Sequence, residues 1–251
     1  MEPQLLHGVT DSVATVVIHH PEKRNAMTSA MWAALPPLLD TLAADPRVRA
    51  LVLTGAGGTF CAGADIGALQ HTPEEAQGLA RHAEDALAAF PKPTLAAVRG
   101  HCVGGGTQLA AACDLRFAEE GALFGVTPAK LGIVYPASST RRLVALTSPA
   151  TAKYLLFSGE LIDPARALRT GLVDEVLPAG ELDKRVAEFT RILVSRSQLT
   201  QAAAKEFADG RPDRDAHWLA QARGSDDLTE GVAAFLQRRP PRFTWSVPTS
   251  G

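Results

Sequence analysis

Short apolar runs and longer amphipathic stretches alternate along the first half of this chain. Residues 13–19, 48–54 and 94–98 are rich in valine, leucine, isoleucine and alanine, which predicts three strands. Residues 73–90 repeat alanine and leucine at helical spacing, and Glu74 and Glu75 fall in the first turn of the helix expected there. Helical stretches between successive strands are typical of the α/β class, which we therefore predict.

A second helix is expected to begin after Thr28, whose hydroxyl can cap it, and to run towards Ala44. Pro36 and Pro37 are expected to kink or interrupt this helix, because proline removes a backbone donor. Two brief strand candidates follow at residues 115–118 and 123–124, and the pattern then becomes mostly helical. The helix candidates there are residues 148–158, 164–170, 181–195 and 229–237. We predict a core over residues 1–195, including its first trailing helices, and a C-terminal helical region over residues 196–251.

The composition changes this picture little. The chain has 251 residues, 46% hydrophobic and 21% charged, which predicts a soluble globular protein with a full core. A net charge of −2 gives no reason to expect nucleic acid or an anionic membrane as a partner. No apolar run approaches the ~18 residues of a membrane span, and the first residues lack an export signal, so we expect a cytoplasmic protein.

Three cysteines, Cys61, Cys102 and Cys113, have no spacing that suggests a metal site, and we predict none. Their odd number fits a reducing compartment. We expect each to be a small buried hydrophobic residue and not a nucleophile.

The candidate chemistry lies in two segments, residues 61–66 and residues 100–110. The second contains Gly104-Gly105-Gly106 and opens into an alanine-rich helix. The first-turn N–H groups of a helix lack partners and attract negative charge, and glycine lets a substrate oxygen approach the backbone. The chain lacks the GxGxxG, P-loop and GxSxG patterns that would indicate a dinucleotide, a phosphate or a serine nucleophile. Close packing of a strand on a helix is the alternative explanation.

Together with other motifs in the same order, these segments resemble the crotonase superfamily, also called the enoyl-CoA hydratase/isomerase family. The resemblance covers nearly the whole chain. The motifs that carry it are Pro21-Glu22-Lys23-Arg24-Asn25-Ala26-Met27, Phe60-Cys61-Ala62-Gly63-Ala64-Asp65-Ile66, Pro91-Lys92-Pro93, Val98-Arg99-Gly100, Gly104-Gly105-Gly106, Ala112-Cys113-Asp114-Leu115-Arg116, Leu131-Gly132-Ile133, Ala167-Leu168-Arg169-Thr170-Gly171-Leu172-Val173 and Glu230-Gly231-Val232-Ala233-Ala234-Phe235-Leu236.

The resemblance implies a spiral of ββα units with a C-terminal helical trimerisation region, assembled as a trimer or a dimer of trimers. It implies an acyl-coenzyme A thioester as ligand, with coenzyme A as part of the substrate and no other cofactor. The backbone N–H groups of Ala64 and Gly105 would form an oxyanion hole for the thioester oxygen. The other implied substrate-binding residues are Lys23 and Arg24 near the phosphates, Ala26, Ala62, Asp65, Ile66 and Gly67 along the coenzyme path, and Lys130.

The sequence departs from the family at both catalytic glutamates of the hydratases. Gln108 stands at the first position, three residues after Gly105, and Pro128 stands at the second. An amide has no usable proton equilibrium near neutral pH and proline has no polar side-chain atom. Because each positioned acid or base is worth ~10²–10⁴-fold in rate, efficient hydration of a double bond is not expected.

Residues 127–135 resemble the matching segment of the family's methylmalonyl-CoA decarboxylases, in which a tyrosine lies at the thioester pocket. Tyr135 is therefore a candidate catalytic side chain, although those enzymes have a histidine where Ala64 stands and keep the first glutamate. Our leading hypothesis is an acyl-CoA protein that stabilises an enolate without two-glutamate hydration. The alternatives are a non-catalytic acyl-CoA binding protein of lipid metabolism and a decarboxylase of a 2-carboxyacyl-CoA.

Overall fold

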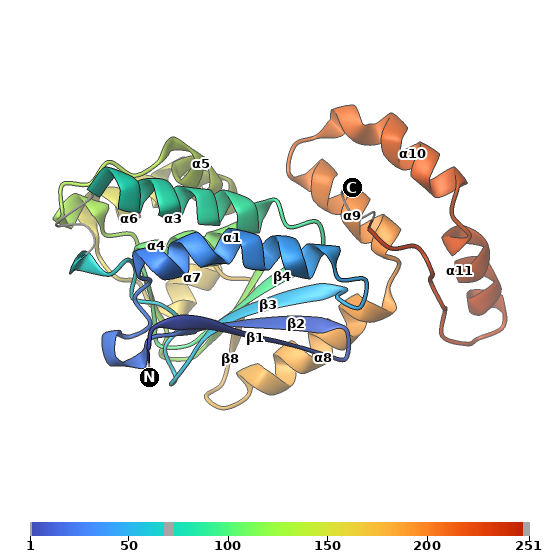
Figure 1. Ribbon diagram of the computed structural model, residues 1–251, viewed down its shortest axis with the longest axis horizontal. Coiled ribbons are helices and arrows are strands. Elements are labelled where there is room, and N and C mark those ends of the chain that lie inside the picture. Colours follow the sequence, from blue (N-terminus) through green and yellow to red (C-terminus); the bar gives the residue numbers. More distant parts are fainter. Residues whose placement is uncertain (1, 68–72, 248–251) are drawn as a thin grey trace.

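A computed structural model shows an α/β fold around a six-stranded sheet (Figure 1). The structure describes residues 2–67 and 73–247. The strands in spatial order are β1 (Gln4–Thr10), β2 (Val13–His19), β3 (Ala50–Gly55), β4 (Thr94–Val98), β6 (Leu115–Glu119) and β8 (Glu175–Leu177). β1 pairs with β2 in antiparallel fashion, and all later pairs are parallel.

A second, two-stranded sheet branches from the first and leads to the glycine run. Its parallel strands are β5 (His101–Val103) and β7 (Leu123–Gly125), each of which follows a strand of the large sheet, β4 and β6. β5 runs directly into helix α4 (Gly105–Ala112). β4, β5 and α4, which follow one another along the chain, form one ββα unit, the repeat that the family resemblance implies.

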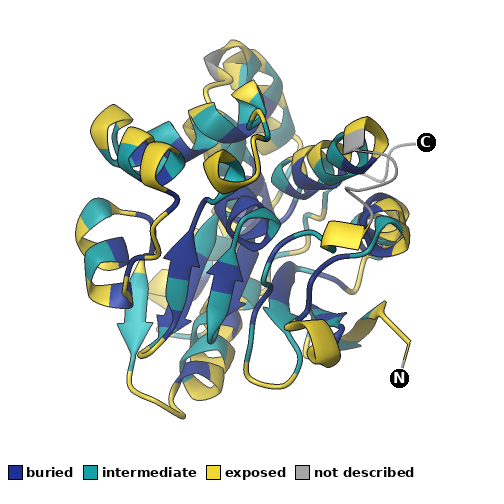
Figure 2. Cartoon of the chain, turned by 90° about the vertical axis from the view of Figure 1, so that its left-hand side faces the viewer, coloured by how far each residue is buried: buried dark blue, intermediate teal, exposed yellow. Residues whose placement is uncertain are grey.

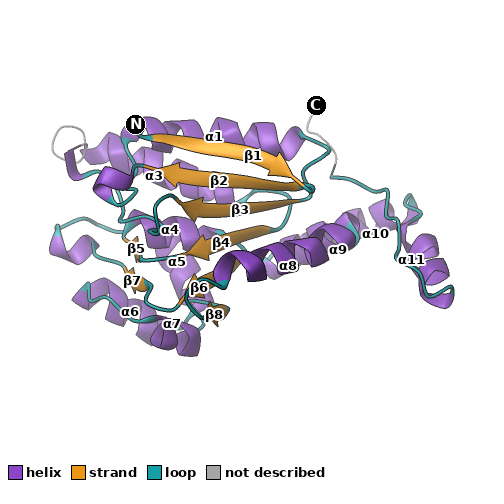
Figure 3. Ribbon diagram, turned by 90° about the horizontal axis from the view of Figure 1, so that it is seen from below, coloured by secondary structure: helices purple, strands orange, loops and turns teal. Residues whose placement is uncertain are grey.

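Helices cover both faces of the large sheet. α1 (Ser29–Ala44) and α3 (Pro73–Ala88) pack against each other on one face, and α8 (Leu182–Ser195) crosses β3, β4 and β6 on the other (Figure 3). The main core lies under α1, α3 and α4, and a smaller apolar cluster joins α8 to the sheet. Figure 2 shows the buried residues concentrated in the strands and on the inner sides of these helices.

The remaining helices lie towards the C-terminus. They are α5 (Ala137–Leu146), α6 (Pro149–Ser158), α7 (Pro164–Thr170), α9 (Gln198–Ala208), α10 (Asp215–Arg223) and α11 (Asp227–Leu236). Short 3-10 turns occur at Pro21–Lys23, Pro128–Lys130 and Pro212–Arg214. α9, α10 and α11 project from one end of the molecule (Figure 1). No helix in the described chain combines the length and apolar character needed to cross a membrane.

Two predictions concern α1. Thr28 caps the helix as expected, with its Oγ1 accepting the N–H of Met31 at 3.2 Å. Of the two effects expected from Pro36 and Pro37, an interruption is absent, because one helix runs through both prolines. A proline inside a helix costs about 3 kcal/mol, whereas each large apolar side chain that α1 buries gains about 1.5–3 kcal/mol. Those buried side chains are Met31, Trp32, Leu35, Leu39 and Leu42.

Candidate functional site

Backbone pairing holds the two candidate segments side by side. Cys61 forms an isolated parallel bridge with Cys102 of β5. The Cys61 N–H donates to the His101 carbonyl at 2.8 Å, and the Val103 N–H donates to the Cys61 carbonyl at 3.0 Å. The segment that leads to Ala64 therefore runs along β5 and ends beside the start of α4.

The glycines are needed for this close approach. A Cβ on Gly106 would lie 2.2 Å from the carbonyl oxygen of Cys61, and one on Gly105 would lie 2.9 Å from the Trp32 ring. Gly104, which caps α4, has φ +56° and ψ −117°, a conformation that side chains strongly disfavour. Close packing thus accounts for Gly106, while Gly104 sets the direction in which α4 begins.

The backbone nitrogens of Ala64 and Gly105 lie close together. A Cβ built on Gly105 would lie 3.4 Å from the Ala64 nitrogen. Ala64 forms an isolated parallel bridge with Met27. Its two hydrogen bonds involve the residues on either side of Ala64: the Met27 N–H donates to the Gly63 carbonyl, and the Asp65 N–H donates to the Met27 carbonyl, both at 2.8 Å. Within residues 2–67 and 73–247, neither the Ala64 nor the Gly105 N–H donates to a protein acceptor. Two N–H groups without a protein acceptor among the described residues therefore lie near each other at the positive end of a helix.

Gln108 lies one turn into α4 and contacts a carboxylate that the sequence did not single out. Glu84 of α3 has no exposed surface, and Gln108 Nε2 donates to its Oε2. Ser139 of α5 also donates to Oε2, and Arg142 donates to Oε1 and makes an ion pair with it. Gln108 Nε2 donates in addition to Ser139 Oγ at 3.1 Å. We refer to Glu84, Gln108, Ser139 and Arg142 as the Glu84 network.

The signal for Glu84 was its place on the buried stripe of residues 73–90. It falls beside Ala83 and one turn from Leu87, both of which are fully buried. A charged residue on the apolar face of a helix is rarely buried without a partner, so the position of Glu84 indicates a buried polar contact.

Pro128 and Tyr135 lie in the segment after β7. Pro128 begins a 3-10 turn, and its carbonyl accepts the N–H groups of Leu131 and Ile133. Tyr135 lines an open cleft of about 740 Å³ between α3 and α5. Burial, and then the negative charge of Glu84, raise the pKa of the Tyr135 phenol far above its usual value, so it stays protonated.

The residues of the expected coenzyme path contact one another between two segments, residues 23–24 and residues 62–67. Lys23 Nζ makes an ion pair with Asp65 Oδ2 at 2.8 Å, and this bond is the main reason that the pKa of Asp65 is lowered. Asp65 Oδ1 accepts the Gly67 N–H at 3.1 Å, so Asp65 fixes its own loop. The Ala62 N–H donates to the carbonyl of Arg24 at 3.0 Å.

Three other predicted residues differ in exposure. Ala26 is buried and its carbonyl accepts from His20 Nδ1 at 2.8 Å. Ile66 is 58% exposed, which leaves an apolar side chain available beside Ala64. Lys130 is exposed, its stem lies against Gly159, and it does not line the cleft beside Tyr135.

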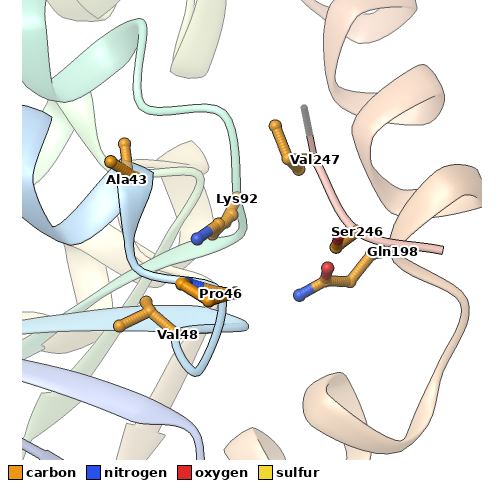
Figure 4. A pocket seen from close by; sticks show the side chains of 8 residues that line it. Ala43, Pro46, Val48, Lys92, Gln198, Ser246 and Val247 are labelled. Carbon is orange, nitrogen blue, oxygen red and sulfur yellow. The ribbon is translucent and has the colours of Figure 1, made fainter. Parts of the chain in front are cut away.

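A second cavity, of about 390 Å³, lies away from these residues (Figure 4). It separates the end of α1 from the C-terminal region, with Lys92 and Gln198 facing it from opposite sides. Lys92 donates to the Asp45 carbonyl at 2.9 Å, so its charge is already engaged. In the described part of the chain, no group of three or more histidine, cysteine or acidic residues could hold a metal ion.

The three cysteines are buried, as predicted. Burial raises the pKa of Cys61 and of Cys113 to about 12, and it raises that of Cys102 as well. Because only thiolates react, we expect the folded protein to react negligibly with a thiol reagent at neutral pH. In denaturant, we expect all three cysteines of each chain to react with the reagent. Rapid labelling of any thiol in the folded protein would contradict this.

Comparison with known proteins assigns the class of this fold and site. The model of the family described as enoyl-CoA hydratase/isomerase matches residues 8–246. A crystal structure of an enoyl-CoA hydratase/isomerase family member superposes with a TM-score of 0.90 at 37% identity, covering 98% of this chain and all (100%) of that one. The chain belongs to the enoyl-CoA hydratase/isomerase family, and its crotonase fold, expected from the motifs, is confirmed.

Two curated relatives are similar over almost their full length. One, from Thermus thermophilus, has a name that proposes enoyl-CoA hydratase activity and is 37% identical over 92% of this chain and 97% of its own. The other, the crotonyl-CoA hydratase of Syntrophomonas wolfei, is 33% identical over 93% of this chain and 95% of its own. Acyl-CoA thioesters are thus the substrate class of the family to which the chain belongs.

Proposed function

We propose that this protein binds an acyl-CoA thioester between the N–H groups of Ala64 and Gly105 and stabilises the enolate formed from it. The observation that carries the proposal is the pair of neighbouring, unengaged amides at the start of α4. Enolisation moves negative charge onto the thioester oxygen. A preorganised donor aimed at such charge contributes about 3 kcal/mol to lowering the barrier.

Hydration through two glutamates does not fit this site. Gln108 and Pro128 occupy the two positions, and Glu84, the carboxylate that Gln108 contacts, already accepts from Gln108, Ser139 and Arg142. A carboxylate with three donors is poorly placed to take a proton from water. We therefore infer enolate chemistry without standard hydration.

Parallel assays with crotonyl-CoA, a 3-enoyl-CoA and methylmalonyl-CoA, together with a binding titration, test this proposal. We expect binding of the thioesters, turnover of a substrate that needs only enolate stabilisation, and little hydration of crotonyl-CoA. Tight binding without turnover of any of the three would leave a non-catalytic binding protein of lipid metabolism. Robust hydration of crotonyl-CoA would contradict the account.

The cleft beside Tyr135 favours a second candidate, the decarboxylation of a 2-carboxyacyl-CoA. When CO₂ leaves, the electron pair of the broken C–C bond passes into the thioester enolate, and the α-carbon then takes up a proton. This reaction needs an oxyanion hole and no base to start it. The protonated Tyr135 phenol is suited to orient the leaving carboxylate. If so, Tyr135→Phe lowers kcat for methylmalonyl-CoA and leaves affinity unchanged, whereas unaltered kinetics would reduce Tyr135 to packing.

Arg24 is the better placed of the two proposed phosphate-binding residues. Lys23 is already bonded to Asp65, whereas the side chain of the exposed Arg24 makes a single polar contact with the residues that the structure describes, a long one of 3.4 Å from Nη1 to His101 Nε2. We expect Arg24→Ala to weaken acyl-CoA binding about tenfold and Lys23→Ala to weaken it less, as measured by calorimetry. An acyl thioester of N-acetylcysteamine, which has no phosphates, is the control. If both variants lost affinity for that compound as well, the phosphate contact would be wrong.

We also propose a cytoplasmic homo-oligomer, a trimer or a dimer of trimers, with α11 at the interface. Leu228, Val232, Phe235 and Leu236 recur along α11 and are 52–83% exposed. Burying one such side chain gains about 1.5–3 kcal/mol, so a second copy of the chain is a favourable cover for them. Phe235→Asp is expected to shift the mass in solution, measured by light scattering, to that of the monomer, while Gln237→Asp keeps the oligomer. A monomeric wild type would contradict the proposal.

A further inference from the structure

The Glu84 network fixes which way the Gln108 carboxamide points. A carboxylate offers only acceptors, so the atom of Gln108 that contacts Glu84 must be Nε2. Ser139 has one hydroxyl proton, and it is donated to Glu84. The Ser139 oxygen is consequently free to accept the other Nε2 proton, at 3.1 Å.

Turning the carboxamide over would bring Oε1 against the carboxylate of Glu84, a contact between two acceptors. Ser139 could then donate to Oε1 only by withdrawing its proton from Glu84, so a hydrogen bond to the carboxylate would be lost in either case. Arg142 strengthens this constraint, because its guanidinium occupies Oε1 of Glu84 and keeps the carboxylate in place. The orientation is therefore set by chemistry and not only by packing.

The opposite side of the carboxamide carries the remaining acceptor. Gln108 Oε1 accepts no hydrogen bond from the residues that the structure describes. It is also not among the described side-chain atoms that are fully buried without a hydrogen-bond partner. Gln108 lies three residues after Gly105 on α4, and residues with this spacing share a helix face. From this spacing we infer that an acyl chain whose oxygen is bound at Gly105 passes beside Gln108.

We propose that Glu84 is a positioning residue that makes Gln108 a fixed hydrogen-bond acceptor towards the acyl group. The site then selects acyl groups that carry a donor, such as a hydroxyl, close to the thioester. This inference rests on the proposed function, because it needs the thioester oxygen to be held at Ala64 and Gly105. It assigns to Gln108 a role in selection in place of the proton transfer that a glutamate would perform.

The affinities of butyryl-CoA and of the two enantiomers of 3-hydroxybutyryl-CoA test this proposal. The wild type is expected to bind one hydroxyacyl enantiomer about three- to tenfold more tightly than butyryl-CoA. In Glu84→Gln, residue 84 can present either an oxygen or an NH₂ group, so Gln108 can turn over and the preference falls to about twofold or less. A ratio of two affinities within one variant does not respond to a general loss of stability.

Asp85→Asn is the matched control. Asp85 adjoins Glu84 and lies 3.5 Å from the same Arg142, but it does not contact Gln108, so this variant should keep the full preference. Equal affinities in the wild type, or a full preference in Glu84→Gln, would overturn the inference. Because equal affinities in the wild type are sufficient to overturn the inference, it stays testable even if Glu84→Gln fails to fold. Failure of all three thioesters to bind would instead overturn the proposed function.

Discussion

Gly106→Ala is expected to lower the free energy of unfolding by about 3 kcal/mol and to abolish acyl-CoA binding. The added methyl group would lie 2.2 Å from the Cys61 carbonyl oxygen, which is a backbone atom and cannot move aside as a side chain can. Relief of this clash must separate α4 from the segment that leads to Ala64. The bridge between Cys61 and Cys102 would open, and the two amides would no longer lie close together.

Gly78→Ala is the control for this prediction. Gly78 lies inside α3, and a Cβ there would meet no atom within 4 Å. Alanine in a helix interior is about 1 kcal/mol more favourable than glycine, so this variant should be at least as stable as the wild type. Urea denaturation measures both. Equal stability of the two variants would show that the close approach at Gly106 is not required.

Gln108→Glu is expected to destabilise the protein by about 3 kcal/mol near neutral pH, although the resemblance to the family's hydratases implies a glutamate at this position. The new carboxylate would touch Glu84 and lose both bonds that Nε2 donates, to Glu84 and Ser139. Two carboxylates in contact raise the pKa of one of them in the folded state.

The sign of the pH dependence follows from that raised pKa. The folded variant holds a proton that the unfolded chain releases at about pH 4.3. Relative to the wild type, the variant is therefore least impaired below that pH, and it loses stability as the pH rises through the raised value. Urea midpoints at about pH 5 and about pH 8 should show a growing deficit.

Exchanging the two residues should remove this deficit. In Glu84→Gln combined with Gln108→Glu, one amide again faces one carboxylate, so the double variant should be more stable than Gln108→Glu alone and less sensitive to pH. If Gln108→Glu matched the wild type at about pH 8, the contact with Glu84 would be wrong.

The predictable parts of the fold are those with strong local signals. β2, β4 and α7 have the bounds expected from the sequence, because short apolar runs and a helix between proline and glycine are local features. β1 is not expected from the sequence, because Gln4–Thr10 is a mostly exposed edge strand in which polar residues and a glycine interrupt the apolar ones. β5 and β8 have only three residues each, and pairing with distant strands defines them.

The same distinction holds for the site. Ala64 and Gly105 could be singled out because glycine-rich motifs mark where a backbone must turn or approach closely. Glu84 could not be given a partner, because it is 24 residues from Gln108, 55 from Ser139 and 58 from Arg142 along the chain. Only the packing of α3, α4 and α5 brings these groups together. The orientation of Gln108 thus depends on a contact that no local motif records.

A crystal structure with a non-reactive acyl-CoA analogue would show directly whether the two amides bind the thioester oxygen. We expect this oxygen about 3 Å from both the Ala64 and the Gly105 nitrogen. An oxygen bound elsewhere, or either N–H donating to a carbonyl of the protein itself, would contradict this expectation.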